Sequence, residues 1–480
     1  MTTRTTIRRS RASAFAYGAL AVFMMGVRPA SPAAASFRVA QELPPDSLTD
    51  SEFWKFFTTM SEPDGYFLSE NFVSNEVSFQ EVIPSLQKTL TPQGVYLGVG
   101  PEQNFTYIAN IAPRMAVIFD IRRQNAMQHL MYKALFEMSA TRPEFVANLF
   151  SRPSVANLPP STPVKALFDS AEAAVPDDSA YKANFAAIVQ RLMVKHGFVL
   201  PATDIESIEH VFGVFFAAGP EVNYGYRSGN PAFVRSTYPS FSMLQAATNA
   251  DSVEMAFLAN EETYQTVRRL QLRNLIVPVV GDFGGPSAIR SVGNWLAARQ
   301  MTVVAFYVSN VEQYLFRDRG ASDRFYANLT ALPLDSTSSF IRSVPGMGSP
   351  MSTFLPGTSG NVQGGVVITV AKDSMGFRLF RTYRDSSGVQ VVVDSTARPT
   401  NKDSLPRDTT IGGILQAARD SIRRANSWQV IGTPVTTIVR GGGLLASGTA
   451  SMKKTIERFF AGDLKSYDVI IGMTKVSGWR

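Results

Sequence analysis

The sequence contains no cysteine among its 480 residues. This absence excludes disulfide bonds, thiolate metal sites and a cysteine nucleophile. Histidine is also scarce: His129, His196 and His210 are the only three, and their spacing matches no metal-binding motif, so we expect no metal. Walker loops, H-E-x-x-H and G-x-S-x-G are missing as well, and the catalytic residues therefore stay unknown at this stage.

The net charge is small outside the N-terminus. The formal net charge is +7, but residues 1–35 contain five arginines and no acid, which leaves 41 basic against 39 acidic side chains in the remainder. A nearly neutral body gives no reason to expect nucleic-acid binding.

The N-terminus has the pattern of a secretory signal peptide. A basic stretch ends at Arg11, an apolar run covers residues 12–27, and Ala33 to Ala35 offer a cleavage site before Ser36. The apolar run is short for a membrane span, which needs about 20 residues, although an uncleaved anchor is the alternative. We expect an exported protein, periplasmic or secreted, without a membrane span after signal removal. Arg8-Arg9 leaves the choice between the Sec and twin-arginine routes open.

Residues 95–125 read as strand, glycine turn, helix and strand. An apolar run ends at Gly98-Val99-Gly100, Glu102 lies where a helix opens, and a second apolar run ends at Asp120. Glycines allow a backbone to approach a ligand closely, and the helix start adds free N–H groups. Asp120 follows Gly100 at the distance where such units place a carboxylate for ribose hydroxyls. A plain βαβ unit with a tight turn is the alternative.

The same alternation returns later. Residues 275–280 form an apolar run that ends before Asp282 and Phe283, and residues 302–308 form another that ends before Asn310. Both runs suit strands buried on two faces, so Asp282 and Asn310 would lie at the carboxyl edge of a parallel sheet. Ser309 and Glu312 have the spacing of a capping box for the next helix.

The fold class that follows is α/β, with a Rossmann-like, mostly parallel sheet and helices on both faces. A helical insertion interrupts it, and a small α+β module follows. We predict these parts: signal peptide 1–35, linker 36–50, first half of the Rossmann-like domain 51–149, helical insertion with an aromatic lid loop 150–260, second half 261–344, linker 345–364 and C-terminal module 365–480. The protein partner of that module is unknown.

The loop of residues 61–76 mixes turn residues with aromatic and polar side chains, among them Asn75 and Glu76. Loops of this kind beside a pocket often bind substrate. The alternative is a helix-capping loop that covers the edge of the sheet. Arg122 and Arg123, which follow Asp120 after one residue, either grip an anionic group or belong to a solvated face.

Residues 95–120, 279–283 and 305–310 together resemble the class I S-adenosylmethionine methyltransferase fold. Residues 48–345 also closely resemble an uncharacterised bacterial family with this Rossmann-like core. The methyltransferase resemblance implies S-adenosylmethionine as the cofactor, with the glycine turn at its methionine part, Asp120 at the ribose and Asp282 with Phe283 near the adenine. The third motif glycine is absent, and the insertion separates the two acids.

The sequence therefore predicts an exported protein that binds a nucleotide-like small molecule, with methyl transfer unproven. The alternatives are a non-catalytic envelope scaffold or binding protein, and a nicotinamide-dependent oxidoreductase. The expected cofactor-binding residues are Gly98, Gly100, Glu102, Asp120, Arg122, Asp282 and Phe283. The expected substrate-binding residues are Asn75, Glu76, Asn310 and Tyr314.

Overall fold

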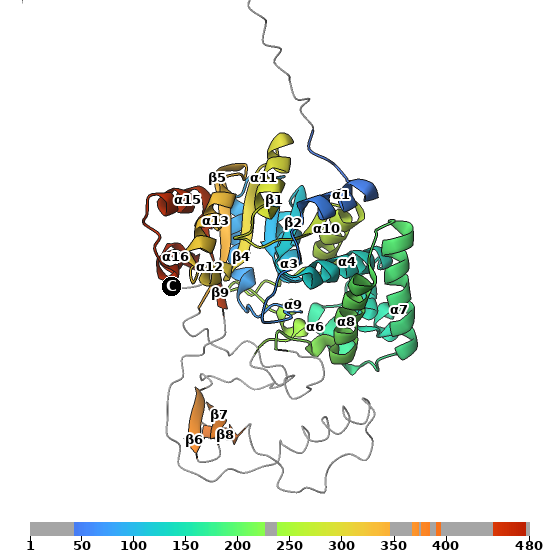
Figure 1. Ribbon diagram of the computed structural model, residues 1–480. Helices are drawn as coiled ribbons and strands as arrows, with labels where there is room; N and C mark the ends of the chain where they lie inside the picture. The colour runs from blue at the N-terminus through green and yellow to red at the C-terminus, as the bar shows by residue number, and fades with distance from the viewer. Residues whose placement is uncertain are drawn as a thin grey trace, which may run out of the picture. The chain divides into compact units, whose positions relative to one another are not determined.

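The structure is a computed structural model that describes residues 43–225, 238–345, 367–373, 376–384, 390–394 and 445–476. The predicted Rossmann-like α/β fold is confirmed (Figure 1). Within the described residues, the main sheet has the strand order β10-β9-β5-β4-β1-β2-β3. Its strands are β1(Val95–Val99), β2(Met115–Asp120), β3(Ile276–Val280), β4(Val303–Ser309), β5(Leu334–Pro345), β9(Leu445–Ser451) and β10(Lys475–Val476).

Strands β1 to β5 are parallel to one another, and β9 and β10 are antiparallel additions at one edge. β2 and β3 are buried along their whole length, and all their residues are apolar except the terminal Asp120, as expected for strands that are covered on both faces. Asp120 pairs in register with Val280, so β2 and β3 end level with each other.

The helices that connect the parallel strands lie in two groups. α3(Gln103–Ile111), α4(Arg123–Met138) and α10(Glu261–Leu272) pack together, and α2(Ile83–Thr89) packs on α3 after the short turn η1(Phe79–Val82). The second group holds α1(Asp50–Met60), α11(Ala288–Ala298), α13(Arg319–Leu329) and α15(Met452–Phe460), with α12(Val311–Leu315) beside α13. α16(Tyr467–Met473) precedes β10.

The predicted helical insertion lies between β2 and β3. It contains α5(Arg142–Phe150), η2(Pro153–Asn157), α6(Val164–Ala173), α7(Asp178–Gln190), the π-helical turn η3(Arg191–Lys195), α8(Ala202–Ala218), η4(Gly219–Glu221) and α9(Phe241–Gln245). α5, α7 and α8 pack against α4, which links the insertion to the Rossmann-like core (Figure 1). Residues 226–237 of the expected lid loop lie outside the described ranges.

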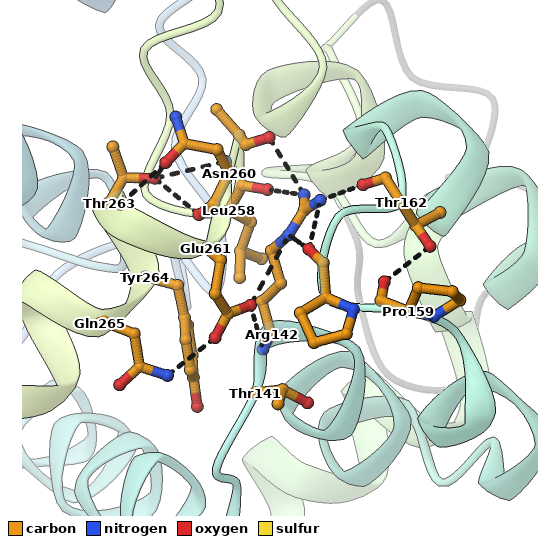
Figure 2. A network of polar contacts seen from close by, with 12 residues as sticks. Thr141, Arg142, Pro159, Thr162, Leu258, Asn260, Glu261, Thr263, Tyr264 and Gln265 are labelled. Atoms are coloured by element: carbon orange, nitrogen blue, oxygen red, sulfur yellow. Dashed lines mark hydrogen bonds and ion pairs between the residues drawn. The ribbon is translucent and has the colours of Figure 1, made fainter.

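Arg142 ties the beginning of the insertion to its end, as Figure 2 shows. Its buried guanidinium donates to the carbonyl oxygens of Leu258 at 2.8 Å and Ala259 at 3.0 Å. It also donates to the carbonyls of Pro160 and Thr162. One side chain therefore joins two loops that are far apart in sequence and fixes where the chain leaves for α10 and β3.

The C-terminal part divides between two sheets. β9 pairs with β5 from Ser339↔Ser451 to Pro345↔Leu445, and thereby extends the main sheet instead of standing apart from it. β6(Val367–Asp373), β7(Gly376–Arg384) and β8(Gln390–Asp394) form a separate antiparallel sheet. The predicted signal peptide and most of the predicted linker 345–364 lie outside the described residues. None of the helices in the described ranges has the length and apolar character of a membrane span.

Candidate ligand site at the carboxyl edge of the sheet

The carboxyl ends of β1 and β4 form the point where the order of the parallel sheet reverses. From β1 the chain proceeds through α3 to β2 on one side, whereas β4 on the other side leads through α12 and α13 to β5. Open α/β sheets bind ligands at this point, outside the carboxyl ends of the strands. The expected site residues surround this edge, so it is the candidate functional site.

One segment crosses the whole edge. We call residues 61–78 the strap. At its beginning, Glu62 N–H donates to the carbonyl of Val280 at 2.8 Å, and the Ser61 hydroxyl accepts from the Val280 N–H at 3.0 Å, both at the end of β3. Further along, the Asp64 carboxylate accepts from the N–H of Arg123 at 2.6 Å, at the start of α4. The strap thus starts at β3 and passes over the end of β2.

The middle of the strap lies over β2 and β1. The Arg122 guanidinium donates to the carbonyls of Ser69 and Glu70. The amide of Asn71 lies against Gly100, 3.4 Å from the position that a Cβ would take there. The sequence allowed two roles for the loop of residues 61–76, substrate binding or coverage of the sheet edge. The structure places this loop across the edge.

The strap ends over β4 and β9 in a buried polar cluster around Glu76. The Glu76 carboxylate accepts from the hydroxyls of Tyr307 and Ser309, each at 2.6 Å, and from the Gln103 amide at 2.9 Å. Ser447 of β9 adds a hydroxyl at 3.4 Å. Four donors from three elements thus satisfy one carboxylate that has little access to water.

The prediction of a capping box at Ser309 and Glu312 is wrong. In the described structure neither side chain caps α12; Ser309 donates to Glu76, and Glu312 receives Arg342 and Tyr326. Ser309 also has a φ of 50°, which a non-glycine residue adopts only when its surroundings hold it there. Buried partners from distant segments outweighed the local capping bond.

The glycine turn after β1 is packed against its own helix. A Cβ on Gly98 would lie 1.8 Å from Oδ1 of Asn104, so that side chain fills the space above Gly98. Asn104 is held there by the Tyr96 hydroxyl at 2.9 Å and by its own bonds to the carbonyls of Val99, Gly100 and Pro101. Gly100, at φ 79°, does require glycine.

Asp120 and Arg122 lie together and engage each other. Nε and Nη2 of Arg122 reach the two carboxylate oxygens of Asp120 at 3.0 and 2.9 Å, and the Arg122 N–H adds a third bond at 2.9 Å. Both side chains are buried. A ribose at this carboxylate would have to compete with a bidentate ion pair.

The turn after β3 is occupied in a similar way. Glu62 accepts from the N–H groups of Asp282, Ser287 and Ala288 at 3.1, 2.7 and 2.7 Å, at the start of α11. Its carboxylate therefore takes the place that an anionic ligand would have at a helix N-terminus. Phe283 points into the core, where it stacks on Phe325 with a ring distance of 5.3 Å.

Three buried polar atoms at the start of α3 or on α4 have no hydrogen-bond partner within the described structure: Oε2 of Glu102, Nδ1 of His129 and Nδ2 of Asn125. His129 contacts the Gly100 carbonyl through Nε2 at 2.8 Å, which makes Nε2 the donor and Nδ1 an acceptor. Burial raises the pKa of Glu102 to about 8 and lowers the pKa of His129 to about 4. Both groups therefore favour their neutral forms.

The expected substrate residues divide between two places. Glu76 is buried in the cluster above, and its neighbour Asn75 is partly exposed. Asn310 contacts Gln313 at 3.3 Å, whereas Tyr314 is 40% exposed and meets the Phe67 ring edge-on at 5.5 Å. Burial and then the nearby Tyr224 raise the pKa of Tyr314, so the described start of the lid loop lies close to it.

The residues present do not fit S-adenosylmethionine while the strap is in place. The space above Gly98 is filled, Asp120 is paired with Arg122, and the N–H groups after β3 are bonded to Glu62. Within the described ranges, acidic and histidine side chains form no group of three that could hold a metal ion.

One family model matches the chain over the parallel strands of the main sheet. The model described as "Domain of unknown function (DUF7790)" matches residues 71–199 and 234–363, more than half of the chain. The chain belongs to this family. The matched DUF7790 segments include the second half of the strap and all of β1 to β5. A comparison with curated proteins gives no match.

The sequence predicted the residues at the edge but not the side chains that contact them. Arg122 was expected to face a ligand, and Glu62, Asn104, Ser447 and His129 were not assigned to the site. Asn104 carried a signal, because it stands near the position where a third glycine is missing. Ser447 and Glu62 carried none, since their contacts depend on strand pairing across the whole chain.

Proposed function

We propose that this protein is an exported, non-catalytic binding or scaffold protein whose methyltransferase-like Rossmann domain has its ligand edge closed by its own strap. The observation that carries the proposal is the bidentate pairing of Arg122 with Asp120, the carboxylate that would otherwise meet a ribose. The occupation of Gly98 by Asn104 and of the β3 turn by Glu62 supports it. Export rests on residues 1–35, and cell fractionation would check it.

A second candidate is binding of a nucleotide-like small molecule of the S-adenosylmethionine type after the strap withdraws. The unpartnered atoms of Glu102, His129 and Asn125 favour it, because buried polar atoms in native proteins are normally satisfied. Nicotinamide-dependent redox chemistry would use the same glycine turn and Asp120, and no separate contact favours it over the first cofactor.

Calorimetric titration with S-adenosylmethionine, S-adenosylhomocysteine and NAD at up to millimolar concentration separates the two candidates. For a closed edge we expect no heat of binding with any of the three. Heat with the wild-type protein would overturn the first proposal. Asp120→Ala should then weaken binding by about tenfold or more, the value of a lost hydrogen-bond pair to a charged group.

Unchanged affinity in a folded Asp120→Ala protein would show that the ligand lies elsewhere and would reject the second candidate. Mass spectrometry of small molecules released from the purified protein provides an independent check. A released nucleotide would contradict closure, whatever the outcome with the three added ligands.

A further inference from the structure

The strap makes a charged contact to the helical insertion that differs from its contacts to the sheet. Nε2 of His210, on α8, lies 2.6 Å from Oε1 of Glu70 in the middle of the strap. Each side chain is 37% exposed, so protons exchange freely with solvent. We propose that Glu70 and His210 form a pH-sensitive latch that holds the middle of the strap over the carboxyl edge.

The surroundings of the pair are simple. Glu70 also accepts from the uncharged Gln124 of α4 at 3.4 Å, and the nearby Arg122 favours its charged form. The Phe72 ring lies 5.7 Å from the imidazole. On α8 itself, Glu206 precedes His210 by one turn. Among these groups, Glu70 is the partner that decides the charge of His210.

The direction of the pH effect follows from both partners. The hydrogen bond to Glu70 raises the pKa of His210, and the same bond lowers the pKa of Glu70. A raised histidine pKa gives stability that is complete below the ordinary value and is lost as pH rises through the raised one. A lowered Glu70 pKa gives stability that is lost only in acid. The latch therefore holds at mildly acidic pH and loosens as the solution becomes alkaline.

The middle of the strap contains exposed side chains next to its buried contacts. Its ends are fixed by Glu62 at β3 and by Glu76 at β4, whereas residues 62–67 contain no helix or strand and Tyr66 and Leu68 are about four-fifths exposed. Release of Glu70 leaves the middle of the strap held by Arg122, which donates to the carbonyls of Ser69 and Glu70, and by Gln128 of α4, which donates to the Phe72 carbonyl at 2.7 Å. The latch rests on the proposed closure of the edge and assigns its regulation.

The absence of cysteine allows a direct test. Val73, fully buried in the strap, is replaced by cysteine in the full chain, and the rate of thiol labelling is divided by the rate for the same protein in denaturant. This ratio reports how often the strap opens at each pH. From pH 6 to pH 9 we expect opening to increase about two- to fivefold, as for a partly exposed ion pair. Cysteine at the exposed Thr58 serves as the control.

In the His210→Gln background, opening should already be increased at pH 6 and should no longer depend on pH. Glu70→Gln removes the other partner and should have the same effect on opening. If circular dichroism shows that His210→Gln is unfolded, the Glu70→Gln protein alone tests the latch. An equal pH dependence with and without the pair would overturn the latch. No ligand is present in this experiment, so its outcome is separate from that of the titrations that test closure.

Discussion

At the scale of single residues, Glu102 is the most unusual group of the candidate site. It lies at the start of α3, is almost inaccessible, and accepts from the Ser74 N–H at 3.4 Å through one oxygen while the other has no partner in the described structure. Burial raises its pKa to about 8. The folded protein therefore retains a proton there that the unfolded chain releases above its ordinary value of 4.5.

This difference makes Glu102 a source of pH-dependent instability. Between about pH 4.5 and pH 8 the folded state binds more protons than the unfolded state, so the free energy of unfolding falls as pH rises, by up to about 4 kcal/mol. Glu102→Gln, which keeps the shape without the proton, should remove this slope. Urea denaturation of both proteins at pH 5 and pH 8 measures it, and parallel slopes would contradict the assignment.

For the residues of the edge, the sequence predicted the positions at the strand ends but not the contacts. Gly98, Gly100, Asp120 and Asp282 follow apolar runs, and the runs alone place them at strand ends. Their partners were not predictable in the same way. Arg122 neutralises Asp120 through a contact two residues away, but nothing local distinguishes that contact from a free arginine that awaits an anion.

At the scale of elements, the strap depends on Glu62. Its carboxylate accepts three N–H groups and the Ser287 hydroxyl at the start of α11. Glu62→Gln removes the charge and leaves a weaker cap, which should lower the free energy of unfolding by about 1–2 kcal/mol. Leu68→Ser, at an exposed position of the same strap, is the matched control and should change it by less than about 0.5 kcal/mol. Equal effects of the two changes in urea denaturation would argue against an anchoring role.

The parallel strands were predictable because their apolar residues form short runs that are visible in the local sequence. The apolar runs place the end of β2 and the bounds of β3 and β4 within a residue of those observed. The pairing of β9 with β5 has no local signal, since residues 346–444 separate the two strands in sequence. For the same reason Ser447 could not be assigned to the cluster around Glu76.

At the scale of the whole molecule, Arg142 joins the beginning of the helical insertion to its end, where the chain leaves for α10 and β3 (Figure 2). Arg142→Met leaves the carbonyls of Leu258, Ala259 and Pro160 without their donor and should reduce the free energy of unfolding by about 2–4 kcal/mol. Arg269→Met, on the exposed side of α10, controls for loss of charge alone. Urea denaturation of the two variants compares them, and similar small losses would show that the insertion is held mainly by apolar packing.

The continuity of the strap has an evolutionary consequence. Because a single stretch of backbone meets the ends of β3, β2, β1 and β4, substitutions that uncover one strand end weaken the hold on its neighbours. Members of DUF7790 with a small side chain at the position of Arg122 should therefore also lack the acid at the position of Glu76 and retain room for a nucleotide. The residues at these two positions would divide the family into members with an open ligand edge and members whose edge is filled by their own side chains.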